Sequence, residues 1–358
     1  MEKIEGRGME GKDRGERPQK DRTSKKSKHE IKNGTIAVIS DGSAVPGLGN
    51  VGGRAALPAL IEKAMLFKEF GGLDAFPICL DTQHTDEIVE TVKHIAPGLC
   101  GICLEGISAP RCFEIEKRLE DELGIPVFHD NQHGPAIAVS AALLNALKLS
   151  GKALEKVRTV VCGAGVSGVA ISKMLRGLGV RDVIVCDSKG ILSANRIPEF
   201  GEGKLDLLEF TNKEGISGGL EKAVAGRDLF VGVSKPNVLT EKLIGTMSQN
   251  PVIIALAEPV PEIEPETAKN AGASVVCTGM PDYPNQINSA LVFPGLFKGA
   301  LAAGATDITR EMKTAAAYGL AGFVSDEELS EEYVLPRADL TGLAAAVAEA
   351  VADAWVEK

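Results

Sequence analysis

Two short stretches decide the fold, Val160–Ala170 (VVCGAGVSGVA) and Val183–Asp187 (VIVCD). The first is an apolar run that leads into the glycine pattern G-x-G-x-x-G, and the second is an apolar run that ends in an acid. Together they predict a strand, a tight turn, a helix and a second strand, the arrangement that binds a dinucleotide pyrophosphate at a helix N-terminus. Gly163 permits the turn, Gly165 lets the backbone approach the phosphates, and Gly168 lets helix and strand pack closely.

The acid at the end of the second stretch has the position of a ribose ligand. Asp187 lies 22 residues after Gly165, the spacing expected of a carboxylate that hydrogen-bonds a ribose 2′-hydroxyl. Its charge repels the 2′-phosphate of NADP, whereas Lys189 offers a cation for that phosphate, so the choice between NAD and NADP stays open. We expect the nucleotide to contact Gly163, Ala164, Gly165, Val166, Ser167, Gly168, Asp187, Ser188, Lys189, Ser234 and Asn288.

Length and composition are those of a globular protein with more than one domain. The chain has 358 residues, 44% hydrophobic and 25% charged, with a net charge of −10. This charge argues against nucleic acid as a partner, and no apolar run reaches the ~18–20 residues that span a membrane. The charged N-terminus lacks the apolar segment of a secretory signal, so we expect a cytoplasmic protein with its cysteines reduced.

The pattern alternates strands and helices on both sides of the glycine turn. Strands are expected at 35–40, 75–80, 101–104, 126–128, 229–233, 252–256 and 273–277. Helices are expected at 58–70, 86–94, 110–123, 308–319 and 340–356, and a long helix at 135–149 has Pro135 in its first turn. This order predicts an α/β protein of two doubly wound, parallel-sheet domains, the second a Rossmann domain.

Beyond the glycine turn, the chain resembles the malic enzymes of the short prokaryotic type over about residues 33–320. The matching segments are Ser40–Asn50 (SDGSAVPGLGN), Lys63–Phe70 (KAMLFKEF), Asp74–Asp81, Ile107–Glu114 (ISAPRCFE), Val127–Asp130 (VFHD), Gln132–Gly134 (QHG), Asn145–Lys148 (NALK), Pro259–Ile263 (PVPEI) and Tyr283–Asn288 (YPNQIN). The resemblance implies NAD(P)-dependent oxidative decarboxylation of L-malate to pyruvate and CO₂ with Mg²⁺ or Mn²⁺. It also implies a homodimer.

The resemblance divides the chain into five expected segments. These are a disordered charged tail (1–32), a substrate and metal domain (33–134), a connecting helix (135–152), the NAD(P)-binding Rossmann domain (153–295) and C-terminal helices (296–358). Ligands of open parallel sheets bind outside the carboxyl ends of the strands, so the site is expected in the cleft between the two domains.

The resemblance also assigns roles to residues of the site. Lys63 corresponds to the catalytic lysine, the base for the malate hydroxyl, and needs a lowered pKa for that role. The substrate positions fall on Glu258, Asn288 and Ser289. The metal positions fall on Glu105, Asp130 and Asn131.

Several of these positions depart from the family pattern. Gly106 stands where a second metal carboxylate is expected, and Asn131 stands where the third is expected. The family's general-acid tyrosine has no counterpart upstream of the first strand. Glu258 and Ser289 replace asparagines, and Pro135 replaces a threonine. One hypothesis is that Glu258 supplies a metal ligand from the opposite wall, which gives a set of Glu105, Asp130 and Glu258.

Three functions therefore remain open. The first is malic enzyme activity, weakened because each lost acid–base group removes about 10²–10⁴-fold in rate. The second is an NAD(P)-binding relative without malic activity that has a regulatory or assembly role. The third is a dehydrogenase for another 2-hydroxy acid.

Overall fold

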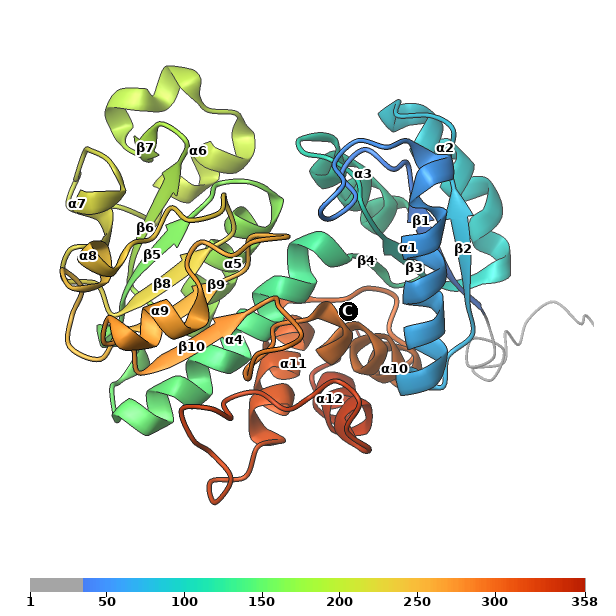
Figure 1. Ribbon diagram of the computed structural model, residues 1–358. Coiled ribbons are helices and arrows are strands. Elements are labelled where there is room, and N and C mark those ends of the chain that lie inside the picture. Colours follow the sequence, from blue (N-terminus) through green and yellow to red (C-terminus); the bar gives the residue numbers. More distant parts are fainter. Residues whose placement is uncertain (1–34, 358) are drawn as a thin grey trace, which may run out of the picture.

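The computed structural model describes residues 35–357, and its strands form two sheets (Figure 1). The expected tail at 1–32 lies outside the described residues. The first sheet has the strand order β2-β1-β3-β4 and is parallel throughout. Its strands are β1 (Thr35–Ser40), β2 (Ala75–Cys79), β3 (Leu99–Leu104) and β4 (Val127–His129).

Helices cover both faces of the first sheet because its strands are apolar on both faces. In β1, Ala37 and Ile39 pack into one cluster with residues of α2 and α3, while Ile36 and Val38 pack into another with residues of α1. The helices of this half are α1 (Gly53–Leu66), the π-helical turn η2 (Phe67–Gly71), α2 (Thr85–Ile95), the 3₁₀ turn η3 (Ala96–Gly98) and α3 (Arg111–Glu122).

The second sheet has the strand order β10-β9-β8-β5-β6-β7. This is the order of a Rossmann domain, with β5 and β8 at the point where the order reverses. Its strands are β5 (Arg158–Cys162), β6 (Asp182–Asp187), β7 (Gly190–Ile191), β8 (Leu229–Gly232), β9 (Val252–Ala255) and β10 (Val275–Thr278). The edge differs from the parallel sheet that we expected, because β7 turns back after Ser188 and Lys189 and pairs antiparallel to β6.

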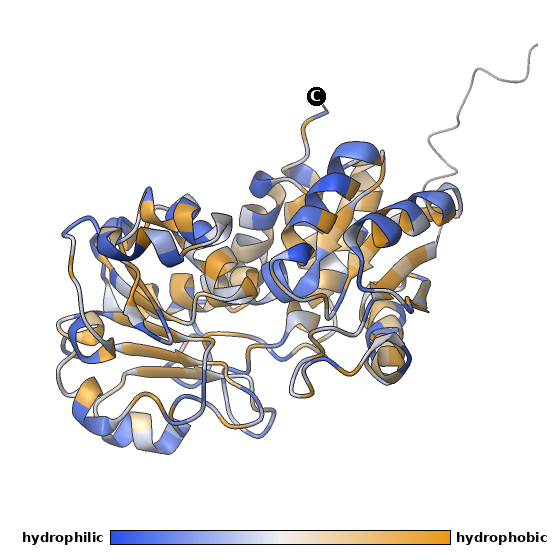
Figure 2. Cartoon of the chain, turned by 90° about the horizontal axis from the view of Figure 1, so that it is seen from above, coloured by the Kyte–Doolittle hydropathy of each residue, from blue (hydrophilic) through white to orange (hydrophobic). Residues whose placement is uncertain are grey.

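The helices of the second half are mostly short, and the longest of them follows the glycine turn. They are η4 (Leu154–Lys156), α5 (Val166–Leu178), η5 (Ala194–Glu199), α6 (Glu202–Leu208), α7 (Leu220–Val224), α8 (Glu241–Ile244) and α9 (Pro265–Asn270). In Figure 2 the strands are coloured as hydrophobic and the outer faces of the surrounding helices as hydrophilic.

The connecting helix α4 (Asp130–Ser150) begins five residues earlier than expected, so Pro135 lies inside it rather than in its first turn. Proline has no N–H to donate to the carbonyl four residues earlier, which is that of Asn131. This carbonyl instead accepts a hydrogen bond of 2.8 Å from Ser167 Oγ in the first turn of α5. Because Pro135 does not use the Asn131 carbonyl oxygen, that oxygen can accept the Ser167 hydroxyl. This hydrogen bond links the start of α4 to α5.

Three C-terminal helices pack on one another, and one of them, α11, also packs against α4 (Figure 1). They are α10 (Phe293–Ala303), which follows the 3₁₀ turn η6 (Ser289–Leu291), α11 (Arg310–Gly322) and α12 (Leu343–Asp353). The helix pattern at 308–319 and 340–356 predicted α11 and α12 and did not predict α10, whose apolar residues are nearly all buried. Within residues 35–357, no helix is long and apolar enough to cross a membrane.

Candidate active site

A cavity of about 640 Å³ lies where the carboxyl ends of the two sheets face each other. It brings together the catalytic, metal and substrate positions that the sequence predicted, together with part of the nucleotide set. Its polar lining includes Glu62, Lys63, Glu105, Asp130, Asn131, Ser167, Ser234, Glu258, Asn288 and Ser289. Residues that are far apart in the sequence and belong to both sheets therefore share one space.

Lys63 of α1 lies on the wall of this cavity between two carboxylates. Its Nζ forms ion pairs with Glu105 Oε2, just after β3, and with Asp130 Oδ2, at the start of α4. The side chain is buried, with an exposed fraction of 10%. Burial alone lowers the pKa of Lys63, but the charges of Asp130 and Glu105 outweigh burial and raise it. Lys63 is therefore an ammonium group in this arrangement.

A cluster of aromatic side chains lies next to Lys63. Phe67, one turn after Lys63, packs against Phe293 and Phe297 of α10 with ring centroids 4.5 and 5.3 Å apart. The Lys63 ammonium lies 4.9 Å from the centroid of the Phe293 ring, within the range of a cation–π contact. The Lys63 ammonium is thus in contact with an aromatic ring as well as with the two carboxylates.

Asn131 holds one of these carboxylates in place. Its Nδ2 donates to Glu105 Oε1 at 2.9 Å, and its Oδ1 accepts the Gly106 N–H at 2.7 Å. Gly106 has a φ of +61°, a left-handed conformation that glycine adopts without strain. Asn131 thus acts here as a brace between two strand ends.

The donor set fits a hard divalent cation through two carboxylates. Asp130 Oδ1 is buried and has no hydrogen-bond partner among residues 35–357, which is costly unless a cation or a polar group meets it. The other member of the pair is Glu105, and carboxylate oxygens are the ligands that Mg²⁺ prefers. Residues 35–357 form no group of three or more His, Cys, Asp or Glu side chains placed to hold a metal ion. Glu258 lines the same cavity, and its role as a third ligand beside Glu105 and Asp130 stays a hypothesis.

The charge of the cavity also favours a bound cation. Four of its described lining residues are acids, namely Glu62, Glu105, Asp130 and Glu258, and Lys63 is the single basic residue among them. A dianionic substrate that enters this space meets net negative charge, and like charges repel strongly in a partly dry cleft. A divalent cation held by Glu105 and Asp130 would reduce that repulsion.

A second cavity, of about 770 Å³, opens at the glycine turn. Gly163, Ala164 and Gly165 line it, and its far wall is formed by residues at the end of β6. A Cβ on Gly168 would lie 1.8 Å from the carbonyl oxygen of Gly163, so this position admits only glycine. The roles expected for the turn and for the packing of α5 therefore match the backbone geometry.

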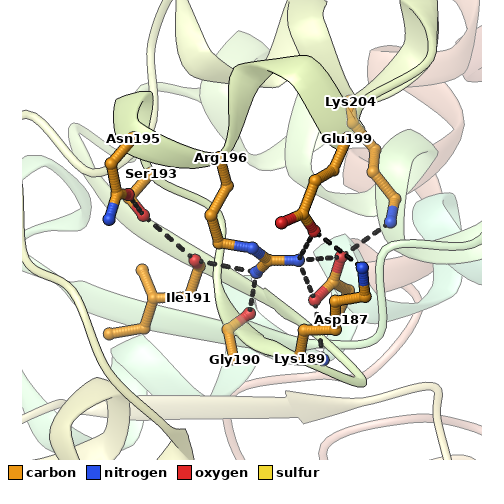
Figure 3. A network of polar contacts seen from close by, with 9 residues as sticks. All are labelled: Asp187, Lys189, Gly190, Ile191, Ser193, Asn195, Arg196, Glu199 and Lys204. Atoms are coloured by element: carbon orange, nitrogen blue, oxygen red, sulfur yellow. Dashed lines mark hydrogen bonds and ion pairs between the residues drawn. The ribbon is translucent and has the colours of Figure 1, made fainter.

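The wall at the end of β6 contains Asp187, Ser188 and Lys189, as expected, and also Lys204, which the sequence pattern did not single out. Asp187 accepts hydrogen bonds from Arg196, Lys204 and the backbone N–H of Lys189 (Figure 3). Arg196 and Lys204 escaped the sequence analysis because they follow β7 and are brought back to Asp187 only by the hairpin.

Comparison with known proteins identifies the family. The family profile "Malic enzyme, NAD binding domain" matches residues 132–356, and "Malic enzyme, N-terminal domain" matches residues 16–120. The chain belongs to the malic enzyme family. The bifunctional malic/malolactic enzyme of Bacillus subtilis is 50% identical over 327 residues, which cover 91% of this chain and 80% of the relative.

Two further malic enzymes show the same relationship. The NAD-dependent malic enzyme of Geobacillus stearothermophilus is 48% identical over 324 residues, which cover 90% of this chain and 67% of the relative. The solved structure of the NAD-dependent malic enzyme of Thermotoga maritima is 48% identical and superimposes with a TM-score of 0.86, covering 90% of this chain and 85% of that one. The family assignment confirms an α/β oxidoreductase of the malate-decarboxylating class that uses NAD or NADP.

No tyrosine is among the described residues that line the cavity around Lys63. Its three tyrosines are Tyr283, Tyr318 and Tyr333, and none of them lines the space around Lys63. The groups with exchangeable protons at the cavity wall include Lys63 and Glu258.

Sequence analysis missed a buried carboxylate directly behind the site. Glu116 of α3 accepts the His129 N–H at 2.7 Å, the Gln132 side chain at 2.5 Å and the His133 ring at 3.1 Å. These three donors flank Asp130 at the start of α4. Burial raises the pKa of Glu116, but His133, followed by Lys313 and His129, outweighs burial and lowers it to about 2. Glu116 is thus an ionised anchor for the segment that carries Asp130.

Proposed function

We propose that the chain catalyses the oxidative decarboxylation of L-malate to pyruvate and CO₂ with NAD or NADP and a divalent metal ion. The observation that carries this proposal is the position of Lys63, whose ammonium pairs with Glu105 and Asp130 in a cavity that also contains Ser167 of the dinucleotide helix. The shared cavity supports the proposal because it would let the base, the two cation ligands and the nucleotide-binding helix act on one substrate.

Lys63 is the base in this proposal. As the hydride leaves C2 of malate for the nicotinamide ring, the amine of Lys63 takes the proton of the 2-hydroxyl, and oxaloacetate results. Loss of CO₂ then leaves enolpyruvate, and the Lys63 ammonium returns the proton to C3. Mg²⁺ or Mn²⁺ held by Glu105 and Asp130, with the amide oxygen of Asn131, would supply Lewis-acid stabilisation of the developing enolate. A cation held by Glu105 and Asp130 would offset the two charges that raise the pKa of Lys63, and so would favour loss of its proton.

We propose that the substrate is positioned by Asn288 and Ser289, which lie at the cavity wall beside the start of α10, and that Glu258 faces it from the loop after β9. The pyrophosphate is proposed to lie on Gly163–Gly168 at the N-terminus of α5, where backbone N–H groups point out of the helix. Ser234 lines both cavities and would lie beside the nicotinamide half of the nucleotide.

A steady-state assay tests this reaction. Purified chain is supplied with L-malate, Mn²⁺ and either NAD⁺ or NADP⁺, and pyruvate and reduced nucleotide are measured. We expect both products, at a rate below that of a family member with the full carboxylate and tyrosine set. Binding of nucleotide with no pyruvate formed favours the binding-only relative, and reduction of nucleotide with other 2-hydroxy acids alone favours the third function.

We also propose that the chain is a cytoplasmic homodimer. An apolar stripe of Leu57, Ile61 and Met65 follows one face of α1 at intervals of four residues and is 40%, 43% and 63% exposed. Phe76 on the neighbouring edge strand β2 is 61% exposed. Exposed apolar side chains gathered in this way mark contact surfaces. The seven free cysteines fit a reducing compartment.

Charge placed on this stripe is expected to break the dimer. Ile61→Glu buries a carboxylate in an apolar contact, so we expect a monomer in size-exclusion chromatography with light scattering at micromolar concentration. Leu149→Glu is the matched control, because Leu149 is 40% exposed but lies on α4, away from the stripe. A wild-type monomer, or an Ile61→Glu variant that stays dimeric, contradicts this surface assignment.

A further inference from the structure

The carboxylate of Asp187 has no acceptor capacity left for a ribose. Its Oδ1 accepts from the Lys189 N–H and from Arg196 Nη2, both at 2.9 Å. Its Oδ2 accepts from Arg196 Nη2 at 2.9 Å and from Lys204 Nζ at 2.7 Å (Figure 3). A carboxylate offers about four acceptor positions, and four contacts fill them. A ribose 2′-hydroxyl therefore finds no free acceptor here.

Arg196 is fixed in this arrangement by groups other than Asp187. Its Nη1 donates to the carbonyl oxygens of Gly190 and Ile191 in β7 at 3.2 and 3.1 Å, and its guanidinium lies 5.2 Å from the Phe200 ring. Displacing it from Asp187 would break these contacts too. Asp187 is thus held neutralised by a rigid cation, and the repulsion expected between its charge and a 2′-phosphate is cancelled.

The cations of this network outnumber its acids. Arg196, Lys189 and Lys204 carry three positive charges, and Asp187 and Glu199 carry two negative ones. Both lysines line the second cavity, at the glycine turn, which we call the nucleotide cavity. Arg196 does not line it. The ammonium of Lys204 uses one donor on Asp187 and keeps others, because an ammonium group has three N–H donors. The side chain of Lys189 is 67% exposed, so it is free to turn from Glu199 toward a stronger anion.

We propose that this network, which we name the Asp187 cradle (Asp187, Lys189, Arg196, Glu199 and Lys204), binds the 2′-phosphate of NADP and makes NADP the preferred cofactor. Lys204 is the specificity-determining residue, with Lys189 as the second cation, and Arg196 is a positioning residue that neutralises Asp187. A 2′-phosphate carries about 1.5 to 2 negative charges and meets a net positive cradle, whereas the 2′-hydroxyl of NAD meets a saturated carboxylate. This proposal rests on the proposed function and adds which of the two nucleotides that reaction uses.

Fragments of the two nucleotides isolate the 2′-phosphate. Calorimetric titration of the full chain with 2′,5′-ADP and with 5′-AMP compares ligands that differ in that phosphate alone. We expect 2′,5′-ADP to bind at least about tenfold more tightly, and Lys204→Ala to weaken 2′,5′-ADP about tenfold while changing 5′-AMP less than threefold, because charge-assisted contacts to phosphate are strong. Lys189→Ala is expected to act in the same direction with a smaller effect.

Lys173→Ala is the matched control. Lys173 pairs with Asp206 at 2.8 Å on the neighbouring helices α5 and α6 but does not line the nucleotide cavity, so neither fragment is expected to change affinity. The proposal is overturned if 5′-AMP binds as tightly as 2′,5′-ADP, or if Lys204→Ala weakens both fragments equally. These titrations need no malate turnover, so they succeed or fail independently of the proposed reaction.

Discussion

Replacing Lys63 with Ala is expected to lower kcat for malate oxidation by about 10²–10⁴-fold, the usual contribution of a general base. Affinity for the nucleotide should stay within about threefold of the wild type. Lys63 lines the cavity between the two sheets and does not line the second cavity, at the glycine turn. Steady-state kinetics for the reaction, together with calorimetry for nucleotide binding, separate the two effects.

Lys63→Arg distinguishes a base from a merely structural cation. Arginine preserves the ion pairs to Glu105 and Asp130 but does not lose its proton in the working pH range, so we expect a folded and equally inactive variant. Lys68→Ala is the control, since Lys68 lies on η2 in an exposed ion pair with Asp74 and should keep full activity. Substantial activity in Lys63→Arg would show that charge, and not proton transfer, is what this position supplies.

Glu116→Gln is expected to be the most destabilising conservative change behind the site. The variant keeps the shape of the side chain but places an amide where the carboxylate accepts three hydrogen bonds from the start of α4. Buried donors that lose their acceptor cost roughly 1–3 kcal/mol in the free energy of unfolding. Urea unfolding at neutral pH measures the loss, and unchanged stability would refute the anchor role.

The pH dependence of stability follows from the same residue. The pKa of Glu116 is about 2 in the folded chain, below its ordinary value of 4.5. Its stabilising contribution is therefore complete above about pH 4.5 and is lost as the pH falls toward 2. We expect wild-type stability to fall across this interval more steeply than that of Glu116→Gln.

Glu120→Gln, one helical turn further along α3, is the matched control for that comparison. Burial, followed by the charge of Glu116, raises the pKa of Glu120 to about 7, so its ionised form is unfavourable in the folded chain. Neutralising Glu120 should leave stability at pH 8 unchanged or raise it. Equal losses in both variants would mean that the carboxylate of Glu116 has no special role.

The parts of the molecule that sequence predicts are those with local signals. The glycine turn and Asp187 lie within one strand–turn–helix–strand unit, and the alternation of apolar runs with helical periodicity locates the other strands. The start of α4 was misplaced because a proline usually marks a first turn, whereas here Asn131 has a partner in Ser167 that makes an interior Pro135 tolerable.

Residues whose roles come from distant contacts escaped prediction. In the sequence, Glu116 resembles the other acids on the polar face of an amphipathic helix. The packing of α3 against β4 brings it to His129. Arg196 and Lys204 reach Asp187 because the β6–β7 hairpin reverses the chain. The family resemblance located Lys63, but its pairing with both Glu105 and Asp130 is a property of the assembled cavity.

The central claim is that Lys63 and the two carboxylates beside it turn malate into pyruvate. Its most direct test is the fate of deuterium from L-malate labelled at C2, incubated with the purified chain, Mn²⁺ and NADP⁺, with Lys63→Ala in parallel. We expect one pyruvate and one deuterated reduced nucleotide for each malate consumed by the wild type, and neither product at a comparable rate from the variant. Bound nucleotide with no pyruvate and no deuterium transfer from the wild type would contradict it.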